Sequence, residues 1–101
     1  MDTRFWGPDG WRLLHSITIG YPEKPSSEDK QLYSVFFKIL KYVLPCIYCR
    51  RSYEQYINEL PIEPFLKNKK SLSEWLYHIH NKVNAKLRGQ GLNPNSDPSF
   101  K

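Results

Sequence analysis

Apolar residues recur at every third or fourth position along most of this chain, which is the spacing of one face of an α-helix. The clearest group lies within residues 26–44 and places six side chains on one face: Leu32, Val35, Phe36, Ile39, Leu40 and Val43. Ser26 and Ser27 supply a cap before this group, and Glu28 and Asp29 add acids to the first turn. We therefore predict a helix that begins at these serines and carries this apolar face.

Two more stretches with the same spacing predict a helix near each end of the chain. The first is expected to begin near Pro8 or Asp9 and to end at Gly20, with four residues on one side: Trp11, Leu14, His15 and Thr18. The second is expected to begin at Ser71, because Ser71 to Glu74 has the form of a capping box, and to end at Gly89. Its common face carries Leu72, Trp75, Leu76, Ile79, His80, Val83 and Leu87.

The only two cysteines, Cys46 and Cys49, are separated by two residues and follow Pro45. Proline favours the first turn of a helix, so a further helix is predicted over about residues 46–60. Backbone N–H groups and the helix dipole then stabilise a thiolate at Cys46 and lower its pKa, and the positive charges of the two following arginines add to this effect.

Cys49 is predicted to point toward the interior, because Cys49, Tyr53 and Tyr56 fall along one helix face. One sulfur is then accessible to a substrate thiol, and the other is placed to pass the electrons on. A structural crosslink stabilises more when it joins distant segments, whereas this pair closes only a small ring. The spacing therefore favours a reversible redox disulfide.

Three other interpretations of the cysteine pair remain open. A zinc site needs two more ligands, but His78 and His80 are one residue apart instead of three to five, and there is no second cysteine pair. A thioredoxin-like pair follows a strand, whereas a long amphipathic helix precedes this one. Two buried, unpaired cysteines would simply pack as small hydrophobes.

No stretch alternates clearly enough to predict a strand, so the fold class is predicted to be all-α. Residues 61–70 form a connection anchored by Phe65 and Leu66, and residues 89–101 are rich in loop-forming residues. The length of 101 residues fits a single domain spanning residues 1–101. No apolar run is long enough for a membrane span, and no signal peptide is visible.

The chain carries a formal net charge of +5. Nucleic-acid binding would require a contiguous basic stripe, but the lysines and arginines are scattered, with a local cluster only at residues 67–70. A polyphosphate cofactor or an acidic partner explains the charge equally well.

Net oxidation by a dithiol needs an acceptor for two electrons, which side chains do not supply. The last predicted helix offers polar groups for a cofactor. His80 and Asn84 lie four residues apart on one face, with Asn81 beside them and Lys86 further along. A lone histidine on an apolar face is more often a core residue, but the two asparagines favour recognition of a polar ring or a ribose.

The first predicted helix offers an aromatic pair. Trp11 and His15 are one turn apart, so their rings lie on the same side of the helix. They either pack in the core or form an aromatic wall on which a ring can stack.

Four segments taken together resemble the Erv/ALR family of flavin-linked sulfhydryl oxidases. They are Phe5 to His15, Tyr21-Pro22, Pro45 to Cys49 and Trp75 to Asn84. Each segment is weak alone, but their order and spacing cover most of the chain. The short N-terminus and the lack of further cysteines are similar to the compact members from large DNA viruses.

The resemblance implies a four-helix bundle, completed by a short fifth helix, that holds FAD without a Rossmann fold. It assigns Cys49 as the cysteine next to the flavin and Cys46 as the distal one. It also implies a set of cofactor-binding residues: Gly7, Trp11, His15, Tyr53, His80, Asn81, Val83, Asn84 and Lys86. Tyr53 is placed there mostly because it lies one turn after Cys49. No metal is expected.

The implied reaction passes electrons from the thiols of protein substrates through Cys46 and Cys49 to FAD. Dioxygen then accepts the electrons and yields hydrogen peroxide. The resemblance also implies a homodimer formed through the first helices.

Two features depart from the family pattern: a cysteine common in the family is replaced by Tyr77, and the chain has no additional shuttle pair of cysteines. For a viral chain the expected location is the host cytoplasm or the virion. The alternative function is a small helical binding module with a structural metal or a buried cysteine pair.

Overall fold

The computed structural model describes residues 3–91, so most of the predicted loop-rich segment 89–101 lies outside the described residues. Four α-helices and one 3-10 helix follow in the order α1 (Thr3–Ile19), α2 (Ser27–Val43), α3 (Ile47–Glu59), η1 (Glu63–Phe65) and α4 (Lys69–Gly89). Residues 3–91 contain no strand, which confirms the all-α class and the four-helix bundle. The short additional element in this range is η1.

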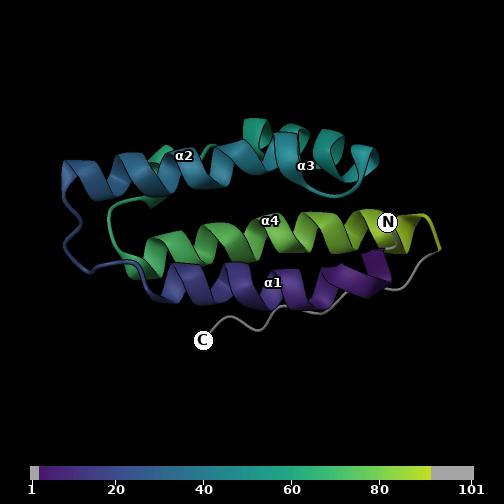
Figure 1. Cartoon of the computed structure of the whole chain (residues 1–101), viewed down its shortest axis with the longest axis horizontal. Helices are drawn as coiled ribbons and strands as arrows, with labels where there is room; N and C mark the ends of the chain where they lie inside the picture. Colours follow the sequence, from purple (N-terminus) through teal and green to yellow (C-terminus); the bar gives the residue numbers. More distant parts are fainter. Residues whose placement is uncertain (1–2, 92–101) are drawn as a thin grey trace.

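The helices form two layers (Figure 1). α1 lies along α4 in one layer and α2 lies along α3 in the other, while α3 also contacts α4. The core between the layers consists mainly of large apolar side chains from α2, α3 and α4, including Phe37, Tyr53, Leu72, Trp75, Leu76 and Ile79. No helix in residues 3–91 combines the length and the apolarity that a bilayer crossing needs.

The start of α2 agrees with the sequence prediction. The Ser26 hydroxyl accepts a hydrogen bond from the Asp29 N–H at 3.0 Å, and the Asp29 carboxylate accepts one from the Ser26 N–H at 2.9 Å. This capping box satisfies two backbone donors that the first turn of a helix leaves without partners.

The predicted start of α1 was wrong by one and a half turns, since the helix begins at Thr3 and contains Pro8. Proline is favoured in the first turn of a helix because it cannot donate a backbone hydrogen bond. Here the helix tolerates that loss, and the residues before Pro8 contribute packing: Gly7 is buried and Trp6 is half-buried.

The predicted start of α4 was also wrong, because the helix begins two residues before Ser71. The side-chain oxygen of Asn68 accepts the Ser71 N–H at 2.8 Å and caps the helix. Ser71 itself is buried. Asparagine is as good a cap as serine, so both positions were plausible from the sequence.

The predicted apolar face of α2 is present, but most of it does not face the core. Five of its members keep between 36% and 59% of their surface exposed: Leu32, Val35, Phe36, Ile39 and Val43. The core is filled instead by Phe37, which is fully buried, with Tyr33 and Leu40 packed against it. This exposed stripe is the α2 apolar face referred to below.

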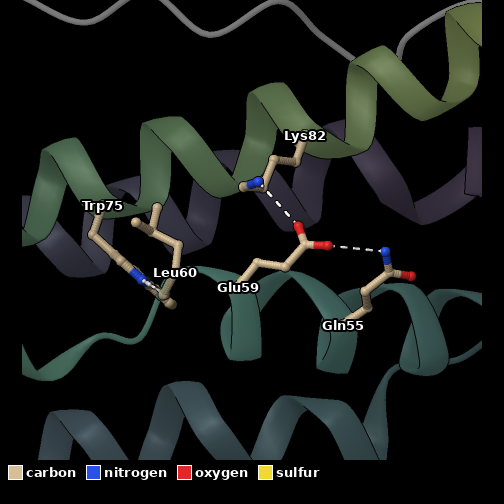
Figure 2. A network of polar contacts seen from close by, with 5 residues as sticks. All are labelled: Gln55, Glu59, Leu60, Trp75 and Lys82. Atoms are coloured by element: carbon tan, nitrogen blue, oxygen red, sulfur yellow. Dashed lines mark hydrogen bonds and ion pairs between the residues drawn. The ribbon is translucent and has the colours of Figure 1, made fainter.

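Polar contacts join α3 to α4 (Figure 2). Glu59 accepts hydrogen bonds from Lys82 at 3.1 Å and from Gln55 at 3.0 Å, and the Trp75 indole donates to the Leu60 carbonyl at 2.8 Å. The Trp75 contact satisfies a polar group in an otherwise apolar core. The Lys82 and Trp75 contacts thus connect α4 to α3 and to Leu60, the C-cap residue of α3.

Candidate active site

Cys46 is the N-cap of α3, as the position of Pro45 predicted. Its sulfur accepts the backbone N–H of Cys49 at 3.4 Å, so a thiol takes the place that a serine or aspartate oxygen commonly fills. Both cysteines are free thiols with intermediate exposure.

The two thiols have opposite pKa shifts. Burial raises the pKa of Cys46, but hydrogen bonds from the Cys49 thiol and from the backbone N–H groups of Cys49 and Tyr48 outweigh it, so the net pKa is lowered. The pKa of Cys49 is raised to about 11, and burial is the largest cause. The hydrogen bond with Cys46 and the negative charge of Cys46 raise it further, while the positive charge of Lys86 lowers it. When the pair carries a single proton, that proton therefore lies on Cys49 and the negative charge on Cys46.

The expected contribution of arginine to Cys46 is not found. The Arg50 Nε instead donates to the Leu44 carbonyl at 2.5 Å and secures the turn between α2 and α3. Local hydrogen bonds at the helix N-terminus lower the pKa of Cys46.

Cys49 lines a cavity of about 380 Å³ that lies among all four helices. This volume falls at the lower end of the range typical of small-molecule sites, roughly 300–1,000 Å³. The walls are mainly aromatic and aliphatic, and include Trp6, Trp11, Leu14, Phe36, Leu40, Tyr53, Val83 and Leu87. Cys46 is not part of the wall, so the predicted division into one sulfur facing the interior cavity and one outside it agrees with the structure.

Next to this cavity three rings form an aromatic cluster. Trp11 stacks on His80 with ring centroids 3.7 Å apart and planes inclined by 7°. Nε2 of His15 lies 3.0 Å from Nδ1 of His80, so the two imidazoles share a hydrogen bond between α1 and α4. Burial lowers the pKa of His15 and so favours the neutral ring. The pair Trp11 and His15 thus belongs to an aromatic wall completed by α4.

Most of the predicted cofactor residues gather at the cavity or the cluster. Gly7, Trp11, Tyr53, Val83 and Lys86 line the cavity, His15 and His80 adjoin it through Trp11, and Asn84 is fully buried one turn after His80. Asn81 differs from the rest, because it lines a separate open depression together with Leu60, Phe65 and His78.

Sequence reasoning missed two polar groups in the cavity wall. Trp6 lines the cavity and its buried Nε1 has no hydrogen-bond partner among the described residues. Ser52 lines it as well, one turn after Cys49, and its hydroxyl accepts a hydrogen bond from Lys86. The i, i+3 spacing of Cys49 and Ser52 was a usable signal; the orientation of Trp6 was not visible in the pattern.

The chain belongs to the Erv1 / Alr family, whose sequence profile matches residues 8–99. It is 40% identical over 85 residues to a probable FAD-linked sulfhydryl oxidase of Acanthamoeba polyphaga mimivirus, covering 83% of this chain and 59% of that protein. It is 36% identical over 87 residues to the mitochondrial FAD-linked sulfhydryl oxidase ERV1 of Saccharomyces cerevisiae, covering 86% of this chain and 45% of that protein. The chain thus spans about half the length of these relatives.

The fold is also similar to a solved structure, the FAD binding domain of Erv1 from Saccharomyces cerevisiae. The TM-score is 0.82 at 35% sequence identity, and the match covers 96% of this chain and 87% of that one. The predicted resemblance to the family is confirmed by sequence and by structure.

The residues of the cavity fit the flavin of FAD. A flat, largely apolar ring system with carbonyl acceptors suits aromatic walls and a small number of polar groups. The Trp6 indole N–H is a buried donor that a ligand acceptor in the cavity would satisfy. Trp11 lines the cavity with an aromatic ring, and His80 stacks on that ring and supports it.

Proposed function

We propose that this chain is a single-domain, FAD-dependent thiol oxidase that forms disulfide bonds in protein substrates with dioxygen as the electron acceptor. The observation that carries this proposal is the position of the two thiols: Cys46 caps a helix outside the cavity, and Cys49 lines the cavity that fits a flavin. Membership of the Erv1 / Alr family and the names of the relatives support it.

In the proposed reaction a substrate thiolate attacks Cys46 of the Cys46–Cys49 disulfide, and Cys49 leaves as the thiolate. A second substrate thiol then displaces Cys46 and completes the substrate disulfide, which leaves both protein cysteines reduced. Cys46 suits the outer role because its lowered pKa makes it a good leaving group in this second step. The net change is two substrate thiols and dioxygen converted to one disulfide and hydrogen peroxide.

Cys49 is assigned to the inner step. When the Cys46–Cys49 bond forms again, the two thiols lose two protons and two electrons, and the electrons leave from Cys49 in the cavity wall. When bound, FAD supplies the two-electron acceptor and passes the electrons to dioxygen. Gly7, Trp11, Tyr53 and Val83 are proposed to hold the flavin ring, since they line the cavity.

The remaining cofactor residues are proposed to hold the rest of FAD. His15, His80 and Asn84 form or adjoin the aromatic cluster beside the cavity. Asn81 lies on the neighbouring depression and is assigned to the outer part of the cofactor.

The test is the visible absorbance spectrum of the purified chain before and after dithiothreitol is added under air, with peroxide measured alongside. The proposal predicts a bound-flavin spectrum that bleaches and recovers while peroxide accumulates. Cys49→Ser should retain the flavin and lose turnover, and Cys46→Ser should lose reaction with protein thiols. A colourless, folded chain that does not take up FAD would favour the binding-module alternative.

We also propose that the chain forms a homodimer in which a second copy covers the α2 apolar face. Leu13 of α1, which is 62% exposed, lines the same cavity as Phe36 and Val43 of this face. Exposed apolar patches of this kind commonly mark interfaces. Sedimentation of Ile39→Glu tests this: a monomeric variant beside a dimeric parent supports the proposal, and equal masses contradict it. Lys30→Glu, an exposed change outside the face, serves as the control.

A further inference from the structure

A hydrogen bond between α3 and α4 crosses the wall of the cavity beside Cys49. The Lys86 ammonium donates to the Ser52 hydroxyl at 2.6 Å, and both residues line the cavity together with Cys49. Ser52 lies three residues after Cys49, so the two side chains share one face of α3. The contact therefore places a charge from α4 next to the inner cysteine.

The charge is isolated within the cavity. Of the described residues that line it, Lys86 alone carries a formal charge at neutral pH, and Cys49 and Tyr53 are the other ionisable groups. The Tyr53 phenol is already engaged, since it donates to the Phe37 carbonyl at 2.5 Å. α1 and α2 contribute only uncharged side chains to the wall. A single charge acts strongly in such surroundings, because the effective dielectric constant is lower than in water.

The ionisation of Cys49 depends on this charge more than the ionisation of an ordinary thiol does. Its ionisation is opposed by burial and by the negative charge of Cys46, and Lys86 is the described side chain that favours it. Burial of a thiol disfavours the thiolate, and a nearby cation restores it. The inner step of the proposed reaction removes the proton and an electron pair from this site.

We propose that Ser52 is a positioning residue that holds the Lys86 ammonium in the cavity wall, where its charge stabilises the thiolate of Cys49. The inference rests on the proposed function, because the thiolate is the form that re-forms the bond to Cys46 as two electrons pass to FAD. A lysine has a flexible four-carbon stem and a strongly hydrated head, so an ammonium without a fixed acceptor turns toward solvent. The Ser52 hydroxyl supplies that acceptor.

This role differs from the one implied by the family resemblance, which places Lys86 among the residues that bind the cofactor. In the structure the ammonium is bonded to the helix that carries the redox pair. Its neighbour on α4, Lys82, points to a different partner, Glu59, at 3.1 Å (Figure 2). The two lysines therefore provide a matched comparison on one helix.

The test follows the alkylation of Cys49 across pH in the full chain with its FAD, in a Cys46→Ser background that leaves one thiol. Ser52→Ala should move the pH–rate profile to higher pH and slow alkylation at pH 8 by about three- to tenfold, the size expected for loss of one hydrogen bond. Ser52→Thr keeps a hydroxyl and should restore the parent profile. Lys86→Gln should shift the profile in the same direction and further.

Lys82→Gln is the control and should leave the profile in place. An unmoved profile in a folded Ser52→Ala variant overturns the inference, as does an unmoved profile in Lys86→Gln or an equal shift in Lys82→Gln. If Ser52→Ala does not fold, Lys86→Gln tests the effect of the ammonium on Cys49 in its place. A colourless chain without peroxide production would contradict the proposed function, whereas a yellow, active chain with an unmoved profile contradicts only this inference.

Discussion

The opposite pKa shifts of the two cysteines lead to a sharp prediction for the reduced protein. Cys46 should be alkylated faster than Cys49 by a limiting amount of iodoacetamide at pH 7. The pKa of Cys46 lies below the ordinary thiol value of 9.0, and that of Cys49 is about 11. Because the thiolate is the reactive form, the difference in ionisation translates into a difference in rate.

The size of the effect can be worked out from these values. A gap of at least about two pKa units gives Cys46 a thiolate population about 100-fold larger than that of Cys49, since one unit is a factor of ten. A thiolate of lower pKa is intrinsically less nucleophilic, by a factor of about ten over two units at a Brønsted slope of 0.4–0.5. The expected ratio of rates is therefore at least about tenfold in favour of Cys46.

The assay uses mass spectrometry after tryptic cleavage at Lys41 and Arg50. Both cysteines then fall in one peptide, residues 42–50, and fragmentation between them assigns the label. The same reaction in concentrated urea is the control, and there the two rates should converge because the helix N-terminus is lost. Equal rates in the folded protein, or faster labelling of Cys49, would refute the assignment of the proton to Cys49.

Three further predictions concern stability and cofactor binding. Tyr53→Phe should lower the free energy of unfolding in urea by about 0.5–1.5 kcal/mol, because the Phe37 carbonyl loses its hydrogen bond from the phenol and keeps only the one from within α2. The same change at exposed Tyr42 should cost less than about 0.5 kcal/mol. The lowered pKa of His15 means that the folded state favours its neutral form. The free energy of unfolding should therefore fall as the pH drops from 6.5 to the pKa that His15 has in the folded protein. His15→Gln should flatten this pH dependence in urea melts. Trp6→Phe should raise the dissociation constant for FAD about three- to tenfold in fluorescence titrations, and an unchanged constant would show that the indole N–H does not bind the cofactor.

The sequence predicted local features well where one residue type has one dominant role. Pro45 predicted the start of α3 and the place of Cys46 at its N-terminus, although the proline lies one residue before the N-cap and not in the first turn. Ser26 located the start of α2. The starts of α1 and α4 were missed, because Pro8 is tolerated inside a helix and because Asn68 competes with Ser71 for the same capping role.

Features that depend on contacts between helices were less accessible. The α2 apolar face has the correct spacing, but periodicity does not distinguish a face that packs in the core from one left for a partner. The hydrogen bond between Ser52 and Lys86 joins residues 34 positions apart, so no local pattern reveals it. The stacking of Trp11 on His80 likewise requires α1 and α4 to lie side by side, as they do in Figure 1.

The sulfur cap of α3 also bears on the reduction potential of the pair. A Cys46 thiolate accepts the Cys49 N–H and gains from the helix dipole, whereas a disulfide sulfur has no charge to contribute. The first turn of α3 is therefore better stabilised in the dithiol state, which raises the potential and makes the disulfide a stronger oxidant. For a two-electron couple, each 1.4 kcal/mol of such stabilisation corresponds to about 30 mV. In the proposed reaction, the helix end thus contributes directly to the driving force for oxidising a substrate.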